Sequence, residues 1–218
     1  MGYFRELPDL QYQSPYSTRI SSTSYVTAKN IFRRMKIRDD LQNVFTIFNK
    51  FTISDGDRPD TVARNFYGKS NLDWVVLISA GITNVRDEWP LSSKELYDFA
   101  VSKYGITELN SVKHYVTTEV KNNRGVIILP AGKVVDEEFK IPKPDIVNQD
   151  TALINPVRGI TYYEYESELN ENKRNISILR PEYLQQFIND IRNEMTYKKS
   201  SQYVNDKLIQ TENTRITI

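Results

Sequence analysis

The sequence predicts an α+β fold: a small strand–helix–helix–strand module with an extended amino-terminal arm, additional β-hairpins and a carboxy-terminal helix. Turn and cap signals cluster around two apolar stretches between Phe51 and Ile82. Short alternating stretches after residue 110 indicate strands, and an apolar stripe of helical period follows Pro181. A chain of 218 residues can bury one moderate core, or a small core with appended segments.

Composition restricts the chemistry that the chain can perform. Lysine and arginine number 29 against 28 acidic residues, so no net field attracts nucleic acid, a membrane or an acidic substrate. With no cysteine and a single histidine, His114, thiol nucleophiles, disulfides and the usual zinc sites are excluded. We therefore expect a protein that is not an enzyme, with no catalytic residues, no cofactor and no metal, and with neither nucleic acid nor membrane as a partner.

Two further features bear on where the chain works. The first residues include Arg5, Glu6 and Asp9 without an apolar stretch, so we expect neither a signal peptide nor an anchor. The longest apolar run, residues 74–78, is too short to span a bilayer, and we expect assembly in a cytosol. The 14 tyrosines suit surfaces that become buried on assembly, with a tyrosine-rich sheet core as the alternative.

Residues 1–24 form the first of four predicted segments. They hold two prolines, many hydroxyl residues and no regular period, which is typical of an extended arm. Their aromatic residues make the arm too apolar for an inert tether, so we expect it to lie along another protein. The residues expected to contact partners are Tyr3, Phe4, Leu7, Tyr12 and Tyr16, together with Tyr163 and Tyr165 farther along the chain.

Residues 25–110 form the second segment and are predicted to hold the module. Apolar residues before Ser54 indicate a strand, and the "SDG" that follows is a turn signal. Asp57 can cap a helix whose first turn holds Pro59. Gly68 stands where a left-handed carboxy-terminal cap is needed, so this helix should end there.

A second and a third helix are expected in the same segment. "SNLD" at residues 70–73 has capping-box spacing, and Trp74 supplies the main buried anchor of a helix that ends at Gly81. The chain should then return as a strand. Ser92 and Glu95 again have capping-box spacing, for a helix that stops at Gly105. We expect Phe66 and Tyr67 to join Trp74 in the core.

Residues 111–195 and 196–218 form the third and fourth segments. "VKHYVTTEVK" and "VIILPAGKVV" are interpreted as strands around the "NNRG" turn, followed by an irregular connector over residues 141–159. Alternation over residues 160–180 predicts a second hairpin with "NENK" at its tip. A helix follows Pro181, with one apolar face, and the polar tail after Met195 has little to bury.

Three carboxylates stand at alternate positions in "YEYESE", and on a strand they would project from one face. Glu164, Glu166 and Glu168 could bind a divalent cation or supply an acid and a base. Polar alternation on a solvated hairpin is the simpler interpretation. His114 has no serine or carboxylate motif beside it, and "DGD" lacks the oxygen spacing of a calcium loop, so both are interpreted structurally.

The stretch "FTISDGDRPDTVARNFYG" followed by "LDWVVLISAGI" resembles a lysin-motif (LysM) module. The resemblance implies a strand, two helices and a strand over about fifty residues, with a groove for N-acetylglucosamine polymers between two loops. Glycan-binding members usually carry an asparagine in the second loop, which this chain lacks. The implied groove residues are Asp55, Gly56, Asp57, Arg58, Pro59, Ser79, Ala80, Gly81 and Ile82.

A longer resemblance runs from "YFRELPDLQY" through "DGDRPDTVARNFYG", "LDWVVL" and "WPLS" to "YYEYESELNENKRNISILRPEYLQQF". In these motifs and their order the chain is similar to the baseplate wedge subunit 53 family of T-even-type contractile-tailed bacteriophages. The resemblance implies a structural virion protein, assembled in the host cytoplasm, that joins adjacent wedges around the hub. Other wedge proteins, the tail hub and neighbouring wedge copies are the implied partners. The alternative is a peptidoglycan-binding LysM module of a tail-associated lysis apparatus.

Overall fold

The computed structural model describes residues 2–14, 25–37, 46–144 and 152–211, which form a mixed α+β fold. The chain divides into two compact units. Unit 1 comprises Met1–Trp89 and Asn175–Ile218, and unit 2 comprises Pro90–Arg174. Unit 2 is thus inserted into the sequence of unit 1, whereas the four segments predicted from the sequence follow one another along the chain.

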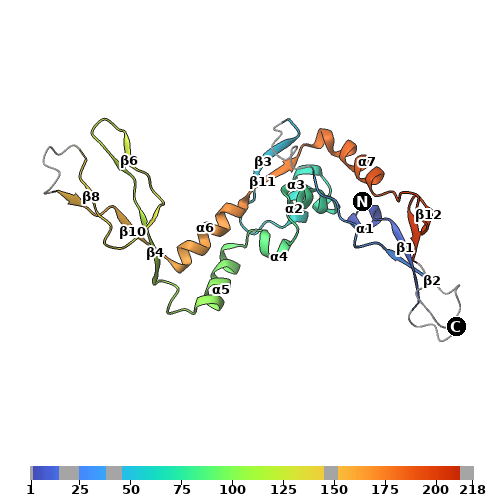
Figure 1. Cartoon of the computed structure of the whole chain (residues 1–218), viewed down its shortest axis with the longest axis horizontal. Coiled ribbons are helices and arrows are strands. Elements are labelled where there is room, and N and C mark those ends of the chain that lie inside the picture. Colours follow the sequence, from blue (N-terminus) through green and yellow to red (C-terminus); the bar gives the residue numbers. More distant parts are fainter. Residues whose placement is uncertain (1, 15–24, 38–45, 145–151, 212–218) are drawn as a thin grey trace. The chain divides into compact units, whose positions relative to one another are not determined.

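Unit 1 contains helices from both of its sequence halves (Figure 1). Its helices are α1 (Tyr3–Glu6), α2 (Pro59–Tyr67), α3 (Asp73–Ala80), α4 (Val85–Glu88) and α7 (Leu184–Glu194), with 3-10 turns η1 (Ser70–Leu72) and η2 (Pro181–Tyr183). Its strands are β1 (Asp9–Gln13), β2 (Tyr25–Lys29), β3 (Phe48–Thr52), β11 (Asn175–Leu179), β12 (Tyr203–Asn205) and β13 (Leu208–Gln210).

A strand–helix–helix–strand module forms the centre of unit 1, but its closing strand comes from far along the chain. β3 pairs antiparallel with β11, so that Thr52 lies opposite Asn175 and Phe48 opposite Leu179 (Figure 1). The Tyr67 hydroxyl at the end of α2 donates to the Leu179 carbonyl at 2.7 Å. The expected strand directly after Ile82 is therefore wrong: the chain forms α4 there, and β11 takes the expected place beside β3.

The carboxy ends of the module's helices lie at the predicted glycines, whereas the caps at their amino ends differ from the prediction. Gly68 (φ 74°) and Gly81 (φ 75°) are left-handed caps, and Pro59 is the first residue of α2. Asp57 is not the cap, because Arg58 occupies that position without a side-chain bond. The capping box at residues 70–73 does not form either, because Ser70 lies inside η1, one turn before α3.

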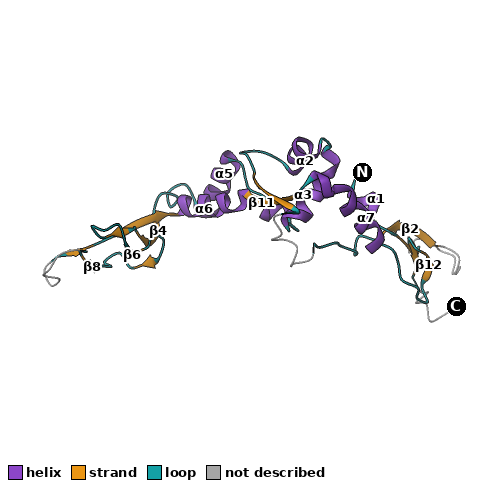
Figure 2. Ribbon diagram, turned by 90° about the horizontal axis from the view of Figure 1, so that it is seen from above, coloured by secondary structure: helices purple, strands orange, loops and turns teal. Residues whose placement is uncertain are grey.

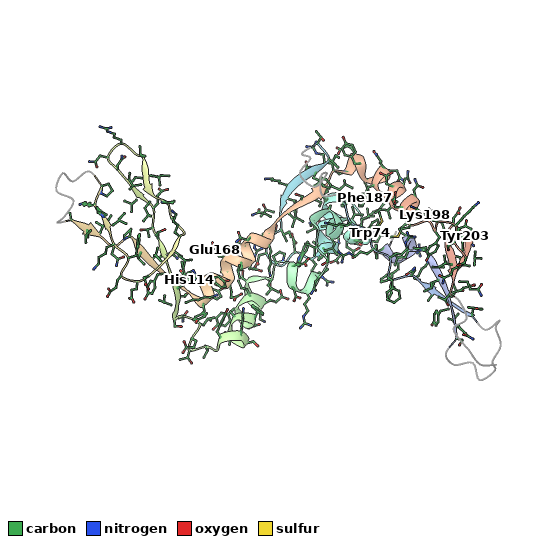
Figure 3. The ribbon with its side chains drawn as sticks, viewed as in Figure 1. Trp74, His114, Glu168, Phe187, Lys198 and Tyr203 are labelled. Atoms are coloured by element: carbon green, nitrogen blue, oxygen red, sulfur yellow. The ribbon has the colours of Figure 1, made fainter. Side chains whose placement is uncertain are left out.

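Apolar side chains from α2, α3, β11 and α7 form the core of unit 1. Trp74 is 5% exposed and stacks on Phe187, with ring centroids 6.2 Å apart (Figure 3). Phe66 and Tyr67 are half-buried and pack against this core, and burial raises the pKa of Tyr67. The apolar face predicted for α7 is confirmed, because the core includes its residues Leu184, Phe187, Ile188 and Ile191, and Met195 just after it.

A four-stranded sheet with the order β12-β13-β1-β2 contains strands from near both ends of the described chain (Figure 2). β1 runs antiparallel to β2 and parallel to β13, with Asp9 opposite Leu208. The described part of the arm therefore contains a helix and a strand of unit 1, and the described part of the polar tail contains β12 and β13. Tyr197 ties this carboxy-terminal segment to the arm, because its hydroxyl accepts from the Asn30 amide at 2.9 Å and donates to the Asp9 carbonyl at 3.1 Å.

Unit 2 combines two helices that lie side by side with short strands (Figures 1 and 2). The helices are α5 (Ser93–Tyr104) and α6 (Tyr162–Arg174). The strands are β4 (Val112–Thr117), β5 (Val120–Lys121), β6 (Ile127–Leu129), β7 (Val134–Val135), β8 (Ile141–Pro142), β9 (Leu153–Ile154) and β10 (Val157–Thr161). They form a sheet of order β10-β4-β7 and the pairs β5-β6 and β8-β9.

The described secondary structure within residues 141–180 differs from the prediction. The predicted hairpin over residues 160–180 is helix α6 followed by β11, and the predicted connector contains β8, β9 and the start of β10. The buried residues of α6 are Glu166, Asn170 and Arg174, which are spaced four apart and therefore share one face of the helix. Because this buried face is polar, no apolar periodicity marks the helix in the sequence. The capping box at Ser92 and Glu95, by contrast, is confirmed at the start of α5.

Candidate partner-binding surfaces

A groove of about 520 Å³ lies beside α3 in unit 1. It is lined by aromatic, aliphatic and cationic residues from three stretches of this unit: Tyr3, Arg34, Met35, Lys36, Trp74, Leu77, Ile78, Ala80, Gly81, Ile82 and Thr83. α1 forms part of its wall because Tyr3 lies against Trp74, with ring centroids 5.9 Å apart. We call this surface the unit 1 groove.

An ion pair fastens α1 to α7 next to this groove. Arg192 donates to the two carboxylate oxygens of Glu6 at 2.7 and 3.1 Å, and the Glu6 side chain is only 6% exposed. The hydrogen bond from Arg192 outweighs burial and holds the pKa of Glu6 below its usual value. The position of α1, and with it Tyr3, is thus set by a bidentate ion pair.

The structure separates the two loops that the LysM resemblance implies as one groove. Ala80, Gly81 and Ile82 line the unit 1 groove, whose lining includes no residue of the loop at positions 55–59. Ser79 is buried and donates to the Val76 carbonyl at 2.9 Å, so its side chain is not available to a ligand. In the other loop Asp55, Gly56 and Arg58 are exposed, and Asp57 and Pro59 are half-buried. The Trp89 indole donates to the Asp57 carbonyl at 2.8 Å and holds this loop against the core.

The predicted arm contacts have different environments. Phe4 is 65% exposed and Tyr12 on β1 is 37% exposed, so both side chains are accessible. Tyr3 is half-buried in the wall of the unit 1 groove. The Leu7 side chain is 3% exposed and packs in the core, where it anchors the end of α1, so this side chain is not accessible to a partner in the isolated chain. Tyr16 lies outside the described residues.

An exposed apolar turn next to Arg33 was missed by sequence reasoning. Arg33 donates to the Met195 and Thr196 carbonyls at 3.0 and 3.1 Å, and so caps the carboxy end of α7. This anchor leaves Ile31 and Phe32 exposed, at 65% and 86%. The stretch from Ile31 to Lys36 mixes apolar and cationic residues without a regular period, so it gives no motif from which the contact could have been recognised.

A larger groove of about 830 Å³ lies in unit 2, where α6 faces β4, β7 and β10. Its lining includes both predicted tyrosines, aliphatic residues and several charged groups: His114, Val116, Thr117, Thr118, Glu119, Ala131, Gly132, Val134, Arg158, Ile160, Tyr163, Glu164, Tyr165, Ser167, Glu168, Leu169 and Asn172. We call it the unit 2 groove. Tyr163 and Tyr165 are half-buried in it, and Figure 3 marks Glu168 on α6 and His114 on β4.

The three glutamates of "YEYESE" do not share one face. Because they lie on a helix, Glu164 and Glu168 face the unit 2 groove, whereas Glu166 is buried on the other side. Glu166 accepts from Lys103 at 2.8 Å and from the Tyr104 hydroxyl at 2.5 Å. Burial alone would raise the pKa of Glu166, but these two hydrogen bonds outweigh it and lower that pKa. The arrangement ties α5 to α6.

The remaining charges of the unit 2 groove are mostly paired. Glu164 accepts from the Thr161 backbone at 3.0 Å and from Arg158 at 2.7 Å, and these bonds lower its pKa. Glu119 pairs with Lys121 at 2.5 Å. Glu168 is exposed and has no ion-pair partner among the described residues.

Within residues 2–14, 25–37, 46–144 and 152–211, no group of three or more histidine, cysteine or acidic residues could hold a metal ion. In the same ranges, no helix has both the length and the apolar character needed to cross a membrane.

Each of the two compact units has an open groove lined by half-buried tyrosine, a residue that is enriched where proteins contact one another. The sequence model of the family described as base plate wedge protein 53, a phage protein family, matches residues 10–193, and the chain belongs to that family. It is accordingly a structural protein of the phage tail baseplate, located in the virion tail, that interacts with other baseplate components. None of the curated proteins compared with the chain matches its sequence.

Proposed function

We propose that the protein joins adjacent wedges around the hub of a contractile phage tail, without making or breaking a covalent bond. The observation that carries the proposal is that one chain presents two grooves on two separate compact units. A chain with two binding surfaces can hold two neighbours at once, and the second contact is then effectively intramolecular. Other wedge proteins and the hub are the proposed neighbours, with assembly in the host cytoplasm.

The module of β3, α2, α3 and β11 is proposed to be LysM-like. Support comes from the antiparallel pairing of β3 with β11 and from the two intervening helices that pack on the same core. The module differs from the LysM pattern in the position of its closing strand, because β11 follows the inserted unit 2 in the sequence. In this proposal the module supplies rigid shape, and the insertion and arms supply contacts.

Reconstitution with purified wedge precursors tests this function. We expect the full chain at micromolar concentration to convert the precursors into rings, observed by sedimentation and electron microscopy. The Phe4→Ser variant removes an exposed aromatic of α1 and should weaken conversion, whereas Lys140→Ser, a change at another exposed position, should leave it intact. Precursors that remain single wedges in the presence of the wild-type chain would contradict the proposal.

Peptidoglycan binding is the second candidate, favoured by the aromatic residues Tyr3 and Trp74 in the unit 1 groove. It ranks lower because Ser79 is buried and the loop at positions 55–59 does not line that groove. Sedimentation of the chain with purified cell walls tests it. Retention that is lost in Ile82→Asp but kept in Ile31→Asp would favour this function, and no retention of the wild-type chain would remove it.

A further inference from the structure

The unit 2 groove has partly exposed apolar side chains along its lining. Val116 and Ile160 contribute from β4 and β10, and Leu169 on α6 is 41% exposed. Val134 on β7, at the edge of the sheet, is 71% exposed. Burial of such aliphatic side chains by a partner is favourable, because it removes apolar surface from water.

The charge of the groove selects among possible occupants. Arg158 is neutralised by Glu164, and Glu119 is paired with Lys121, so these groups attract neither sign strongly. Glu168 remains as an exposed carboxylate without an ion-pair partner in the described part of the chain, one residue from Leu169. An anionic occupant such as nucleic acid would meet this carboxylate without compensation. A cation next to apolar side chains complements both properties.

We propose that the unit 2 groove binds an apolar segment that carries a lysine or arginine and belongs to another baseplate subunit. The apolar side chains of the segment cover Val116, Val134 and Leu169, and its cation lies against Glu168. Tyr163 and Tyr165 border the same groove and can contact both the apolar and the polar parts of the segment. The inference rests on the proposed joining function, because it names the chemistry of one of the joined partners.

Photo-crosslinking in assembled particles identifies the occupant. A photoreactive amino acid replaces Leu169 in the full chain, and a second preparation carries it at Glu138, which is exposed in unit 2 and does not line the groove. We expect position 169, and not 138, to crosslink to a segment of another subunit with apolar residues and a lysine or arginine. A crosslink to an acidic segment, to a second copy of this chain, or no crosslink at all would overturn the inference.

Charge reversal tests the role of Glu168. Because the residue is exposed, Glu168→Lys should fold with an unchanged melting curve, while the yield of the crosslink from position 169 falls about tenfold or more, since like charges then face each other. Glu168→Gln should give a smaller loss, and Glu138→Lys none. Equal yields for Glu168→Lys and Glu138→Lys would overturn the inference. If particles still incorporate the Glu168→Lys chain, the joining function is not contradicted, whatever the crosslink yield. Baseplates that never incorporate the wild-type chain would contradict the joining function itself.

Discussion

At the scale of single residues, the polar face of α6 shows how an ionised side chain can be part of a core. Glu166 is 6% exposed, and its carboxylate accepts from Lys103 and from Tyr104. The pKa of Glu166 is lowered in the folded chain, and the same contact with Glu166 raises the pKa of Lys103. Because the pKa of this carboxyl is lower in the folded chain than in the unfolded chain, where it is about 4.3, the ionised carboxylate stabilises the fold at any pH above about 4.3. This contribution is lost as the pH falls through the pKa of the folded chain.

Glu166→Gln should therefore reduce stability at pH 7 and flatten its dependence on pH. We expect a loss of about 1–2 kcal/mol, because Gln keeps the shape but leaves Lys103 without its carboxylate, and Lys103 is itself half exposed to screening solvent. Thermal melts followed by circular dichroism between pH 3 and 7 measure this. Glu168→Gln on the exposed side of the same helix is the control and should change stability by less than about 0.5 kcal/mol. Identical pH profiles for wild type and Glu166→Gln would contradict the role of the carboxylate.

Trp74→Ala should destabilise unit 1 by about 3–5 kcal/mol, because it leaves a cavity between Tyr3 and Phe187. Urea unfolding followed by the fluorescence of Trp89, the other tryptophan of the chain, reports on the same unit. Phe4→Ala removes an exposed aromatic nearby and should have little effect. A midpoint for Trp74→Ala equal to that of Phe4→Ala would show that Trp74 is not the anchor.

At the scale of elements, local signals predicted α2, α5 and α7, because each of these helices has a proline, capping box or apolar stripe in its own sequence. They could not predict α6, whose buried face is polar and whose "YEYESE" imitates the alternation of a strand. They could not predict that β3 pairs with β11, since register between distant strands is not encoded locally. Of the predicted contact residues, Tyr163 and Tyr165 lie in a groove, but Leu7 is buried because an apolar residue also suits a core.

Gly68→Val should destabilise the module through the backbone and not through a clash. Gly68 has a φ of 74°, and a Cβ at this position would meet no atom within 4 Å. A β-branched residue in the left-handed region costs about 1–2 kcal/mol, whereas asparagine tolerates this region better. Melting curves should therefore rank wild type above Gly68→Asn and Gly68→Asn above Gly68→Val. Equal melting temperatures for all three would refute the left-handed cap.

At the scale of the whole molecule, the insertion of unit 2 makes a prediction about independence. Unit 1 has its own core, its own two sheets and both tryptophans, and the two-stranded pairing of β3 and β11 closes it. Because no strand of unit 1 pairs with a strand of unit 2 in the described residues, the module does not need the insertion for its hydrogen bonding. Sequence patterns could not reveal this division, since the boundary at Trp89 falls in the short connection between α4 and α5 and resembles any other link between helices.

Replacement of residues 90–174 by a flexible Gly/Ser linker should therefore leave unit 1 folded. A linker of about ten residues has an average reach of roughly 16–19 Å. Blue-shifted tryptophan emission and a cooperative melt would show that Trp74 and Trp89 stay buried. Removal of residues 90–179 with the same linker also deletes β11 and should abolish the cooperative transition. A shortened chain without cooperative melting even with β11 present would contradict the independence of unit 1.

The late position of β11 also affects the order of events during translation. The ribosome completes β3, α2 and α3 and then synthesises all of unit 2 before Asn175 emerges. At bacterial speeds this delay is on the order of ten seconds, during which the nascent module lacks its second strand. A polypeptide that stalls inside unit 2 therefore cannot complete the module, so only a chain translated beyond Leu179 can supply a finished module to a growing particle.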